Sequence, residues 1–347
     1  MTSLSDKIRE KALELGFTKA GIVRAGALDM EGERLSGWLG REFHGQMTWM
    51  VREPEKRSDP RALLPGCRSV VVAAMNYWPG EAEAAPRPGR GKVALYARGR
   101  DYHRVLGEKL KALATWLDAE AGSTSRAFVD TGPVLERAWA ERAGIGWIGK
   151  NANLLTRDRG SWLLLGEILT TAKLTPDAGP HAEFCGTCTA CLDACPTGAI
   201  ESPGVVDAHR CISYWTIEHR GDIPEAMRPA IGDWIFGCDL CLEVCPWNRF
   251  AKAGREARFA AREDRAAPAL EPLLELDDAG FRRKFNGSPI QRATRDGFVR
   301  NVCVALGNVG GESSRAALAR AASNDSSEVV RAHARWGLEQ IELRNGG

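Results

Sequence analysis

Apolar and polar positions in the first half of the chain recur with two periods, and each predicts a different element. Helical spacing in residues 4–16, ended by Gly16, predicts a first helix. The valine-rich run Ser69–Met75 is continuous, as in a buried strand. Helical spacing returns in residues 101–120 and predicts a long amphipathic helix. Shorter apolar runs predict strands at 19–23, 93–97 and 127–129.

The remainder of residues 1–178 adds a helix, a hairpin and loops. Pro133 suits a first helical turn, so a helix is predicted from there to Gly144. Two apolar runs, 153–156 and 162–169, are expected to pair as a hairpin. Polar or Pro- and Gly-rich sequence predicts loops at 52–60 and 79–91. Because helices and strands follow one another without strict βαβ alternation, we predict an α+β domain.

The last hundred residues have helical spacing, and one segment recurs within them. The segment from Val299 to Gly307 is echoed by Val330 to Gly337, with the arginines 31 positions apart. This period is typical of stacked helix pairs of the HEAT kind, although any two amphipathic helices can look alike. We therefore predict three domains, at 1–178, 179–250 and 251–347.

The composition is that of an ordinary soluble protein. The chain has 347 residues, 44% hydrophobic and 27% charged, enough for two or three domains with cores. Its start lacks the apolar region of a secretory signal, and no apolar run is long enough to span a bilayer. We therefore expect a cytoplasmic protein without membrane contact, whose thiols stay reduced. With a net charge of +2, any nucleic-acid contact requires a local basic patch.

Eight of the ten cysteines lie within residues 185–246, at the spacing of an iron–sulfur protein. The run Cys185-x2-Cys188-x2-Cys191-x3-Cys195-Pro196 matches the bacterial ferredoxin pattern, whose fourth cysteine binds the other cluster. The second run, Cys238-x2-Cys241-x3-Cys245-Pro246, has Ile235 where its first cysteine is expected, and Cys211 is the available replacement. This predicts two 4Fe–4S clusters, one held by Cys185, Cys188, Cys191 and Cys245 and one by Cys195, Cys211, Cys238 and Cys241.

Other uses of these cysteines fit the sequence less well. Structural zinc also uses Cys-x2-Cys pairs, but a compact run of four ending in Cys-Pro, echoed by a second Cys-Pro, favours clusters. A disulfide scaffold is disfavoured in a long chain without a secretory signal. Cys67 and Cys303 lie outside the set, and we expect each to be a small buried hydrophobic residue.

Asp130 ends an apolar strand and precedes Thr-Gly-Pro, which leaves two roles open. It is either a helix-capping or turn residue, or an acid at the mouth of a sheet whose partial burial raises its pKa enough to donate a proton. Asp101 is expected to cap its helix. His103 is one residue out of register with a cobalt-ligating histidine motif, so we do not expect it to ligate cobalt.

A glycine motif, Gly144-x-Gly146-x-x-Gly149-Lys150, resembles a nucleotide-binding loop. It follows a helix instead of a strand, and Asn151 stands where such a loop needs Ser or Thr. A tight backbone turn is the prediction.

Residues 281–300 carry an excess of positive charge at the edge of the candidate helical repeat. Six basic residues are set against one acid, Asp296, with phenylalanines interspersed. A charged, solvated face is the usual explanation of such a run, whereas a single-signed excess beside a helical repeat suits phosphate contacts on a structured RNA. We favour RNA contacts, made by Arg282, Arg283, Lys284, Arg292, Arg295 and Arg300.

Over nearly its whole length the chain resembles the epoxyqueuosine reductases, cobalamin-dependent enzymes of tRNA wobble-base modification. Besides the cysteine runs, the resemblance rests on Arg57-Ser58-Asp59-Pro60, Gly99-Arg100-Asp101-Tyr102-His103, Val129-Asp130-Thr131-Gly132-Pro133, Glu141 to Asn151, Gly166-Glu167 and Cys245-Pro246-Trp247-Asn248. It implies an N-terminal α/β cobalamin domain like that of reductive dehalogenases, a ferredoxin-like two-cluster domain, and HEAT-like helices that help hold the tRNA anticodon stem-loop.

The resemblance also implies residue roles and partners. Asp130 matches the family's proton donor and, with Arg57, Leu154, Leu165, Cys238 and Asp239, falls where the family touches cobalamin. The implied partners are a tRNA with a GUN anticodon and an electron donor such as flavodoxin or ferredoxin, and the protein is expected to be a monomer.

The implied activity is reduction of the epoxide of epoxyqueuosine to queuosine, the last step of queuosine biosynthesis. It consumes two electrons, carried singly by the clusters to cobalamin as Co(I), and two protons, one from Asp130. One alternative is a small-molecule reductase of the dehalogenase kind, which gives no reason for the basic helical region or for the absence of a twin-arginine signal. Another is an iron–sulfur electron carrier or RNA-binding module, which leaves the N-terminal domain without a task.

Overall fold

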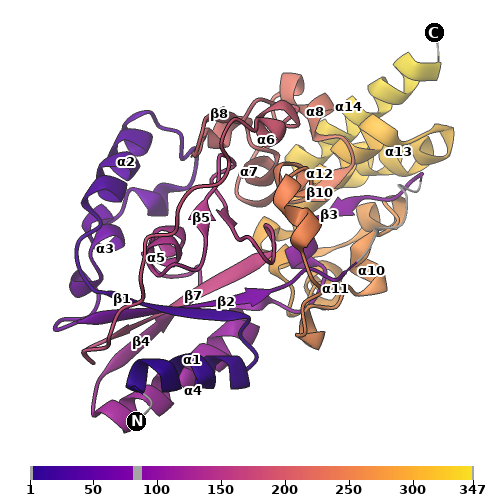
Figure 1. The fold of residues 1–347 in the computed structure, drawn as a ribbon. Coiled ribbons are helices and arrows are strands. Elements are labelled where there is room, and N and C mark those ends of the chain that lie inside the picture. Colours follow the sequence, from indigo (N-terminus) through magenta and orange to yellow (C-terminus); the bar gives the residue numbers. More distant parts are fainter. Residues whose placement is uncertain (1–2, 81–87, 346–347) are drawn as a thin grey trace.

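The computed structural model describes residues 3–80 and 88–345, so most of the predicted loop at 79–91 lies outside the described residues. The N-terminal part is built on a four-stranded antiparallel sheet of order β1-β2-β7-β4 (Figure 1). The strands are β1 Lys19–Arg24, β2 Ser69–Asn76, β4 Ser125–Phe128 and β7 Leu163–Thr170. Every residue of β2 is buried, as its continuous apolar run predicted.

Helices cover both faces of this sheet. Successive residues of β2 point to opposite sides and all are buried, so both faces are packed. One face packs through Val71 and Ala73 against α1 (Leu4–Glu14) and α4 (Tyr102–Ala121). The other packs through Val70 and Val72 against α5 (Glu136–Arg142) (Figure 1). The result is a mixed helix and sheet fold, as predicted.

Local capping fixes where two of these helices begin. Ser3 caps α1 and forms a capping box with Asp6, and Gly16, with φ of +92°, follows the end of the helix. Asp101 caps α4 by accepting the His103 N–H at 3.1 Å, which confirms the predicted cap. The start of α4 is therefore held in place by the residue that precedes it.

The predicted hairpin is wrong, because its two runs find other partners. Leu154–Leu155 forms β6, which pairs with β5 (Trp147–Ile148), while β7 pairs with β2 and β4. Only a bridge between Thr156 and Gly160 remains of the hairpin. The glycine motif turns at Gly144, as predicted, but then runs through β5 to Lys150. A Cβ on Gly146 would lie 2.1 Å from the Leu155 carbonyl oxygen, so only glycine fits there.

Three other predicted elements differ from the structure. The helix expected from Pro133 begins only at Glu136, because the backbone turns tightly at Gly132, whose carbonyl accepts the Val134 N–H. The strand expected at 93–97 is shortened to β3 (Lys92–Val93), because the Asp239 carboxylate captures the Leu95 N–H. The polar loop at 52–60 contains a helix, α3 (Pro54–Ser58), with proline in its first turn.

Apart from α2, the remaining elements are short up to residue 284 and longer after it. They are α2 Asp29–Gly40, α6 Ala190–Asp193, β8 Ile200–Ser202, β9 Val205–Val206, α7 Ile212–Ile217, α8 Arg228–Ile231, β10 Trp234–Phe236, α9 Leu240–Glu243, α10 Glu263–Ala266, α11 Asp278–Lys284, α12 Thr294–Val309, α13 Arg315–Asn324 and α14 Glu328–Asn345. Short 3₁₀ helices lie at Thr48–Met50, Pro60–Ala62, Leu95–Ala97, Ala208–Arg210, Glu225–Met227, Pro246–Phe250, Ala257–Phe259, Glu271–Glu275, Pro289–Ala293 and Glu312–Ser314.

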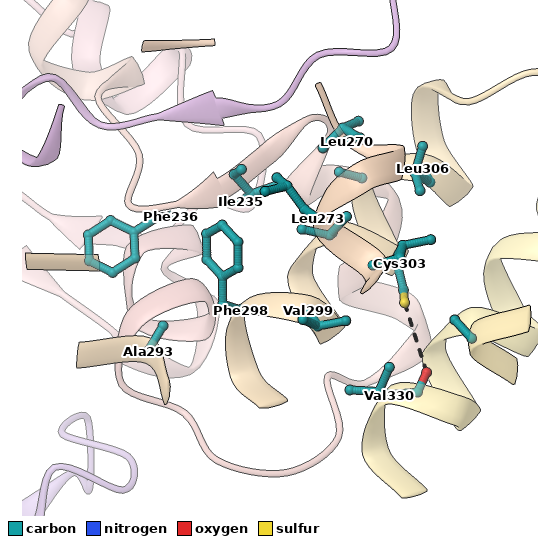
Figure 2. Packing of buried hydrophobic residues seen from close by; sticks show 14 of the residues in the cluster. Ile235, Phe236, Leu270, Leu273, Ala293, Phe298, Val299, Cys303, Leu306 and Val330 are labelled. Atoms are coloured by element: carbon teal, nitrogen blue, oxygen red, sulfur yellow. Dashed lines mark hydrogen bonds between the residues drawn. The ribbon is translucent and has the colours of Figure 1, made fainter. Parts of the chain in front are cut away.

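The C-terminal helices share one core with the cysteine-rich region. Phe298 and Cys303 of α12 pack with Ile235 of β10 and Val330 of α14 (Figure 2). Val93 of the N-terminal segment joins the same core, so residues from all three predicted domains meet there. This shared core holds the cysteine region against both neighbours, and the three-domain division and the HEAT-like repeats stay predictions.

The two cysteines outside the cluster set are buried, as predicted. Cys67 packs under the sheet among apolar residues, and the Cys303 thiol donates to the Val330 carbonyl at 3.9 Å (Figure 2). Among the residues described, none of the helices combines the length and apolar character needed to span a lipid bilayer.

Candidate active site

The two cysteine runs fold alike, fifty positions apart. In the first, Leu192 and Asp193 donate their backbone N–H groups to the Thr189 carbonyl, at 2.8 and 3.0 Å. In the second, the residues fifty positions later repeat the pattern, with both N–H groups 2.8 Å from the Asp239 carbonyl. The resulting short helices, α6 and α9, contact each other. The cysteine region is therefore an internal duplication of the ferredoxin kind.

The thiols of the first run gather with one cysteine of the second. Burial raises the pKa of the Cys191 thiol, and interactions with Cys185, Cys245 and Cys188 add to the rise. These four residues make up the first predicted ligand set. Four thiols in one place match the donors of a 4Fe–4S cluster.

The second predicted set gathers in the same way. Burial raises the pKa of the Cys238 thiol to about 12, and interactions with Cys211 and Cys195 add to the rise. Burial also raises the pKa of the Cys241 thiol, with Cys211 and Cys238 contributing. Ile235, which occupies the expected cysteine position, is fully buried in the C-terminal core, so Cys211 is the thiol that the fold brings to this group.

These thiols are available to bind metal clusters. All ten cysteines are free of disulfides. In the described part of the chain no three His, Cys, Asp or Glu side chains are spaced for a single metal ion. A 4Fe–4S cluster instead distributes its four thiolates over four irons. The assignment of each cysteine to a cluster stays a prediction.

Asp130 lies where the end of β4 meets the start of α4. The Tyr102 hydroxyl donates to Asp130 Oδ2, and His103 Nε2 lies 3.4 Å from the same oxygen. Its backbone φ of +53° falls in the left-handed region, which is uncommon outside glycine and clusters at functional sites. Asp130 does not cap α5, which begins six residues later, so its predicted capping role is wrong and its turn role is confirmed.

The electrostatics of Asp130 differ from the sequence prediction. Burial acts to raise the pKa of its carboxyl, but hydrogen bonds from His103 and Tyr102 outweigh it and lower the pKa. Burial acts to lower the pKa of His103, but its bonds to Asp101 and Asp130 raise it to about 9. At neutral pH the site therefore holds an aspartate carboxylate beside an imidazolium. Because 57% of the Asp130 side chain is accessible, solvent weakens this pairing.

A tryptophan that the sequence did not single out joins two of the predicted site residues. The Arg57 guanidinium donates to the Trp49 carbonyl at 2.9 Å. The Arg292 guanidinium lies 4.9 Å from the Trp49 ring centroid and is ion-paired with Glu218 at 3.0 Å. The negative charge of Asp130 contributes to the raised pKa of Arg292, after the larger effect of its bond with Glu218. The fold thus brings Arg57 and Arg292 together at Trp49, and the charge of Asp130 acts on Arg292.

The residues predicted to touch cobalamin offer both apolar and polar surface. Leu154 and Leu165 are buried in the core beneath α5. Asp239 is also buried, with its carboxylate accepting the Leu95 N–H at 2.6 Å, and the Cys238 carbonyl accepts the Ser213 hydroxyl at 3.4 Å. Arg57 Nε is buried and has no hydrogen-bond partner among the described residues. An unmet buried donor and buried apolar side chains are the kinds of group that a large cofactor with polar edges contacts.

The predicted RNA-binding run divides into exposed and buried residues. Arg282, Arg283 and Arg292 are exposed and Lys284 is half-buried. Arg295 is buried and ion-paired with Asp325 at 2.5 Å. Arg300 is buried and donates to the backbone carbonyls of Trp215, His219 and Gly221. The prediction that Arg295 and Arg300 contact RNA is therefore wrong, because both guanidinium groups are enclosed and serve the fold.

Replacing Arg300 with leucine should destabilise the protein without changing the RNA affinity of the folded fraction. The change leaves several buried carbonyls without a donor, which costs about 2–4 kcal/mol. Chemical denaturation and stem-loop binding measure the two effects. Arg283→Leu, at an exposed position, is the matched control and should leave the free energy of unfolding within about 0.5 kcal/mol. Equal stability of the two variants would contradict the structural role.

Comparisons with known proteins decide the family. Residues 57–131 match the family model described as "Epoxyqueuosine reductase QueG, DUF1730", and residues 184–248 match that of a "4Fe-4S double cluster binding domain". The epoxyqueuosine reductase of Xanthomonas campestris pv. campestris is 44% identical over 99% of this chain and 97% of its own length. That of Gloeobacter violaceus is 48% identical over 89% of this chain and 98% of its own. The chain belongs to the epoxyqueuosine reductase family.

A solved structure of this family has the same fold. An epoxyqueuosine reductase crystallised with an epoxyqueuosine-modified tRNA-Tyr stem loop superposes with a TM-score of 0.92 and 34% identity, over 97% of this chain and 90% of that one. Family membership confirms the predicted oxidoreductase and the double-cluster domain. The two ligand sets and the role of Asp130 stay predictions.

Sequence reasoning missed several polar residues of this site. Tyr102 and His103 contact Asp130, although the sequence gave them no role beside it. Glu136 accepts the Asp130 N–H at 2.5 Å. Glu167 is completely buried in β7. Glu167 could have been recognised from the sequence, because a carboxyl group within an otherwise apolar strand requires an explanation.

Proposed function

We propose that this epoxyqueuosine reductase family member reduces the epoxide of epoxyqueuosine at the tRNA wobble position to queuosine, with cobalamin and two 4Fe–4S clusters. The full-length similarity to epoxyqueuosine reductases carries this proposal. The site supports it, because an acid with two hydrogen-bonding neighbours lies in the same fold as two sets of four thiols. Epoxide reduction requires both a proton supply and an electron supply.

The reaction sets the tasks of the protein side chains. Both C–O bonds of the epoxide break, a C=C bond forms, and the oxygen leaves as water after taking up two electrons and two protons. Cobalamin, when bound, supplies the strongly reducing centre, and the clusters supply electrons one at a time. Arg57, Leu154, Leu165, Asp239 and the Cys238 backbone would hold it.

Asp130 is the group proposed to deliver a proton to the departing oxygen. Tyr102 and His103 orient its carboxylate, and the accessible face of Asp130 is open to a substrate. Because this carboxylate is ionised at rest, it must receive a proton before it can donate one. The neighbours of Asp130 therefore belong to the mechanism.

The proposed RNA surface lies beside this acid. The positively charged guanidinium of Arg292 lies over the exposed Trp49 ring. Bases of a single-stranded loop can stack on such a pair. Arg282, Arg283 and Lys284 extend the positive charge outward for phosphate contacts. A macromolecular substrate explains these residues, whereas a small molecule does not.

Arg292→Ala should weaken binding of an anticodon stem-loop by about tenfold, which is about 1.4 kcal/mol. The substitution removes a charge and one partner of the Trp49 ring. Fluorescence anisotropy with a labelled stem-loop measures the change. Arg315→Ala is the control, because Arg315 is a comparably exposed, ion-paired arginine on α13. Unchanged affinity in Arg292→Ala would remove this residue from the RNA surface.

Two alternative functions make different predictions in the same experiments. A small-molecule reductase of the dehalogenase kind binds cobalamin but not an anticodon stem-loop. A non-catalytic electron carrier binds neither cobalamin in stoichiometric amount nor an epoxide substrate. Removal of one oxygen from an epoxyqueuosine-containing stem-loop, detected by nucleoside mass spectrometry, supports the proposed reductase over both.

The proposal also covers the partners, the oligomeric state, the location and the domain architecture of the protein. They are a GUN anticodon on the tRNA, flavodoxin or ferredoxin as electron donor, a monomeric state and a cytoplasmic location. A dehalogenase-like N-terminal domain and HEAT-like repeats in the C-terminal part complete it. The packing of α12 and α13 on α14 supports stacked helices at the end of the molecule away from the sheet (Figure 1).

A further inference from the structure

Glu167 is a carboxyl group in an unusual place. It is 0% exposed, and neither of its carboxylate oxygens has a hydrogen-bond partner among the described residues. It lies on the central strand pair, opposite Val72 of β2 and Phe128 of β4. Burying an ionised carboxylate without partners costs several kcal/mol, so the fold alone gives no reason for this residue.

The direction of the Glu167 side chain brings it towards the active site. Leu165 and Leu169 share its face of β7, because side chains two apart in a strand point the same way, and both pack in the core that contains α5. Glu136 is the first residue of α5 and accepts the Asp130 backbone N–H at 2.5 Å. Glu167 therefore points from β7 into the core against which α5 packs, and Glu136 at the start of α5 reaches the Asp130 backbone, an order from interior to accessible site that we call the carboxyl line.

Within the carboxyl line, burial and neighbouring charges raise the pKa values of Glu136 and Glu167, so these two residues tend to keep a proton. Burial raises the pKa of Glu136 to about 7, and the negative charge of Asp130 adds to this effect. Burial also raises the pKa of Glu167 well above its ordinary value, with the charges of Glu136 and Asp130 contributing. Arg137 and His103 oppose the rise at Glu136. At neutral pH the outer carboxyl is ionised while the inner pair retains a proton.

We propose that the partly exposed Glu136 and the fully buried Glu167 form a proton reservoir that recharges Asp130 during turnover, an inference that rests on the function proposed above. In the transfer, an O–H bond of the protonated pair breaks and an O–H bond forms on the Asp130 carboxylate. The pair carries the negative charge until a solvent proton returns. No electron moves in this step, since the two electrons of the reaction come from the clusters.

Two glutamine variants test the reservoir in the cluster-loaded, cobalamin-loaded enzyme. Glu167→Gln and Glu136→Gln keep the side-chain shape, and the second still accepts the Asp130 N–H, but neither can release a carboxylic proton. Single-turnover rates with an epoxyqueuosine stem-loop should fall by about 100-fold. Glu141→Gln is the matched control, because Glu141 lies on the same helix and accepts the Ile148 N–H at 2.8 Å. Its rate should equal that of the parent enzyme.

The pH profile separates a proton supply from a packing role. The protonated fraction of the pair falls as the pH rises through its pKa, so the parent rate should decline above about pH 7. Glu136→Gln should lose this decline, while Glu141→Gln retains it. Parent-like rates and profiles in both glutamine variants would overturn the reservoir. Absence of turnover in the parent enzyme would instead overturn the proposed function.

An infrared measurement without substrate supplies a readout independent of activity. The difference spectrum between the parent enzyme and Glu167→Gln at slightly acidic pH should show the C=O band of a buried, protonated carboxyl group. Parent minus Glu141→Gln should lack it. Should Glu167→Gln fail to fold, Glu136→Gln carries both readouts. A spectrum without the carboxylic band would show that the pair holds no proton and would overturn the proposal.

Discussion

Replacing Asp130 with asparagine should reduce turnover by about 10²- to 10⁴-fold while cluster content, cobalamin binding and stem-loop affinity stay at parent levels. Asparagine tolerates the left-handed backbone at this position, and its amide oxygen can still accept the bond from Tyr102. It cannot carry a proton to the epoxide oxygen. Single-turnover conversion measures the loss, and iron content and cobalamin absorbance establish that the variant is intact.

Asp101→Asn is the control for this experiment. Asp101 Oδ1 lies 2.8 Å from Nδ1 of His103, the ring nitrogen that does not face Asp130. Asp101 also caps α4, and asparagine is an equally good cap. The control perturbs the same histidine without touching Asp130, so its turnover should stay within about tenfold of the parent. Parent-like turnover in Asp130→Asn would assign the proton transfer to another group, with Tyr102 and His103 the neighbouring candidates.

Cys211→Ser should remove one of the two clusters, and with it about half of the bound iron and nearly all turnover. Cys211 is the ligand that the cysteine spacing alone did not supply, and it lies among the thiols of Cys238, Cys241 and Cys195. Because electrons reach the substrate through the clusters, loss of either one interrupts the supply. Iron and sulfide analysis after anaerobic reconstitution, with electron paramagnetic resonance of the reduced protein, measures the cluster content.

Cys67→Ala provides the comparison for that variant. Cys67 is buried among apolar residues under the sheet and is outside both ligand sets. Its replacement should leave the iron content unchanged, whatever its effect on stability. A full complement of iron in Cys211→Ser would show that a different group completes the second cluster.

The periodic parts of the fold were predictable from the sequence. Continuous burial of β2 and the amphipathic pattern of α4 follow from one-dimensional spacing, and the caps at Ser3 and Asp101 follow from local chemistry. The hairpin failed because strand pairing depends on distant partners. Residues 163–170 find longer partners in β2 and β4 than the short run at Leu154 offers. Propensity cannot rank such choices.

The candidate site divides in the same way. Its cysteines were singled out because cluster chemistry imposes their spacing, and Asp130 was singled out as an acid by the family resemblance. The ionisation of Asp130 was not predictable from the sequence. It depends on hydrogen bonds from Tyr102 and His103, which belong to a different element, α4. Arg295 and Arg300 look like RNA ligands in sequence, yet the fold encloses both. Charge along a sequence does not reveal which side of a helix meets solvent.

We propose that this protein deoxygenates epoxyqueuosine in tRNA, with cobalamin and two clusters acting together. The most direct test is an anaerobic reaction of the cluster-reconstituted protein with a reductant and an epoxyqueuosine-containing stem-loop, with and without cobalamin, followed by nucleoside mass spectrometry. We expect the loss of one oxygen mass only when cobalamin is present. No conversion by protein that holds both clusters and cobalamin would contradict the claim.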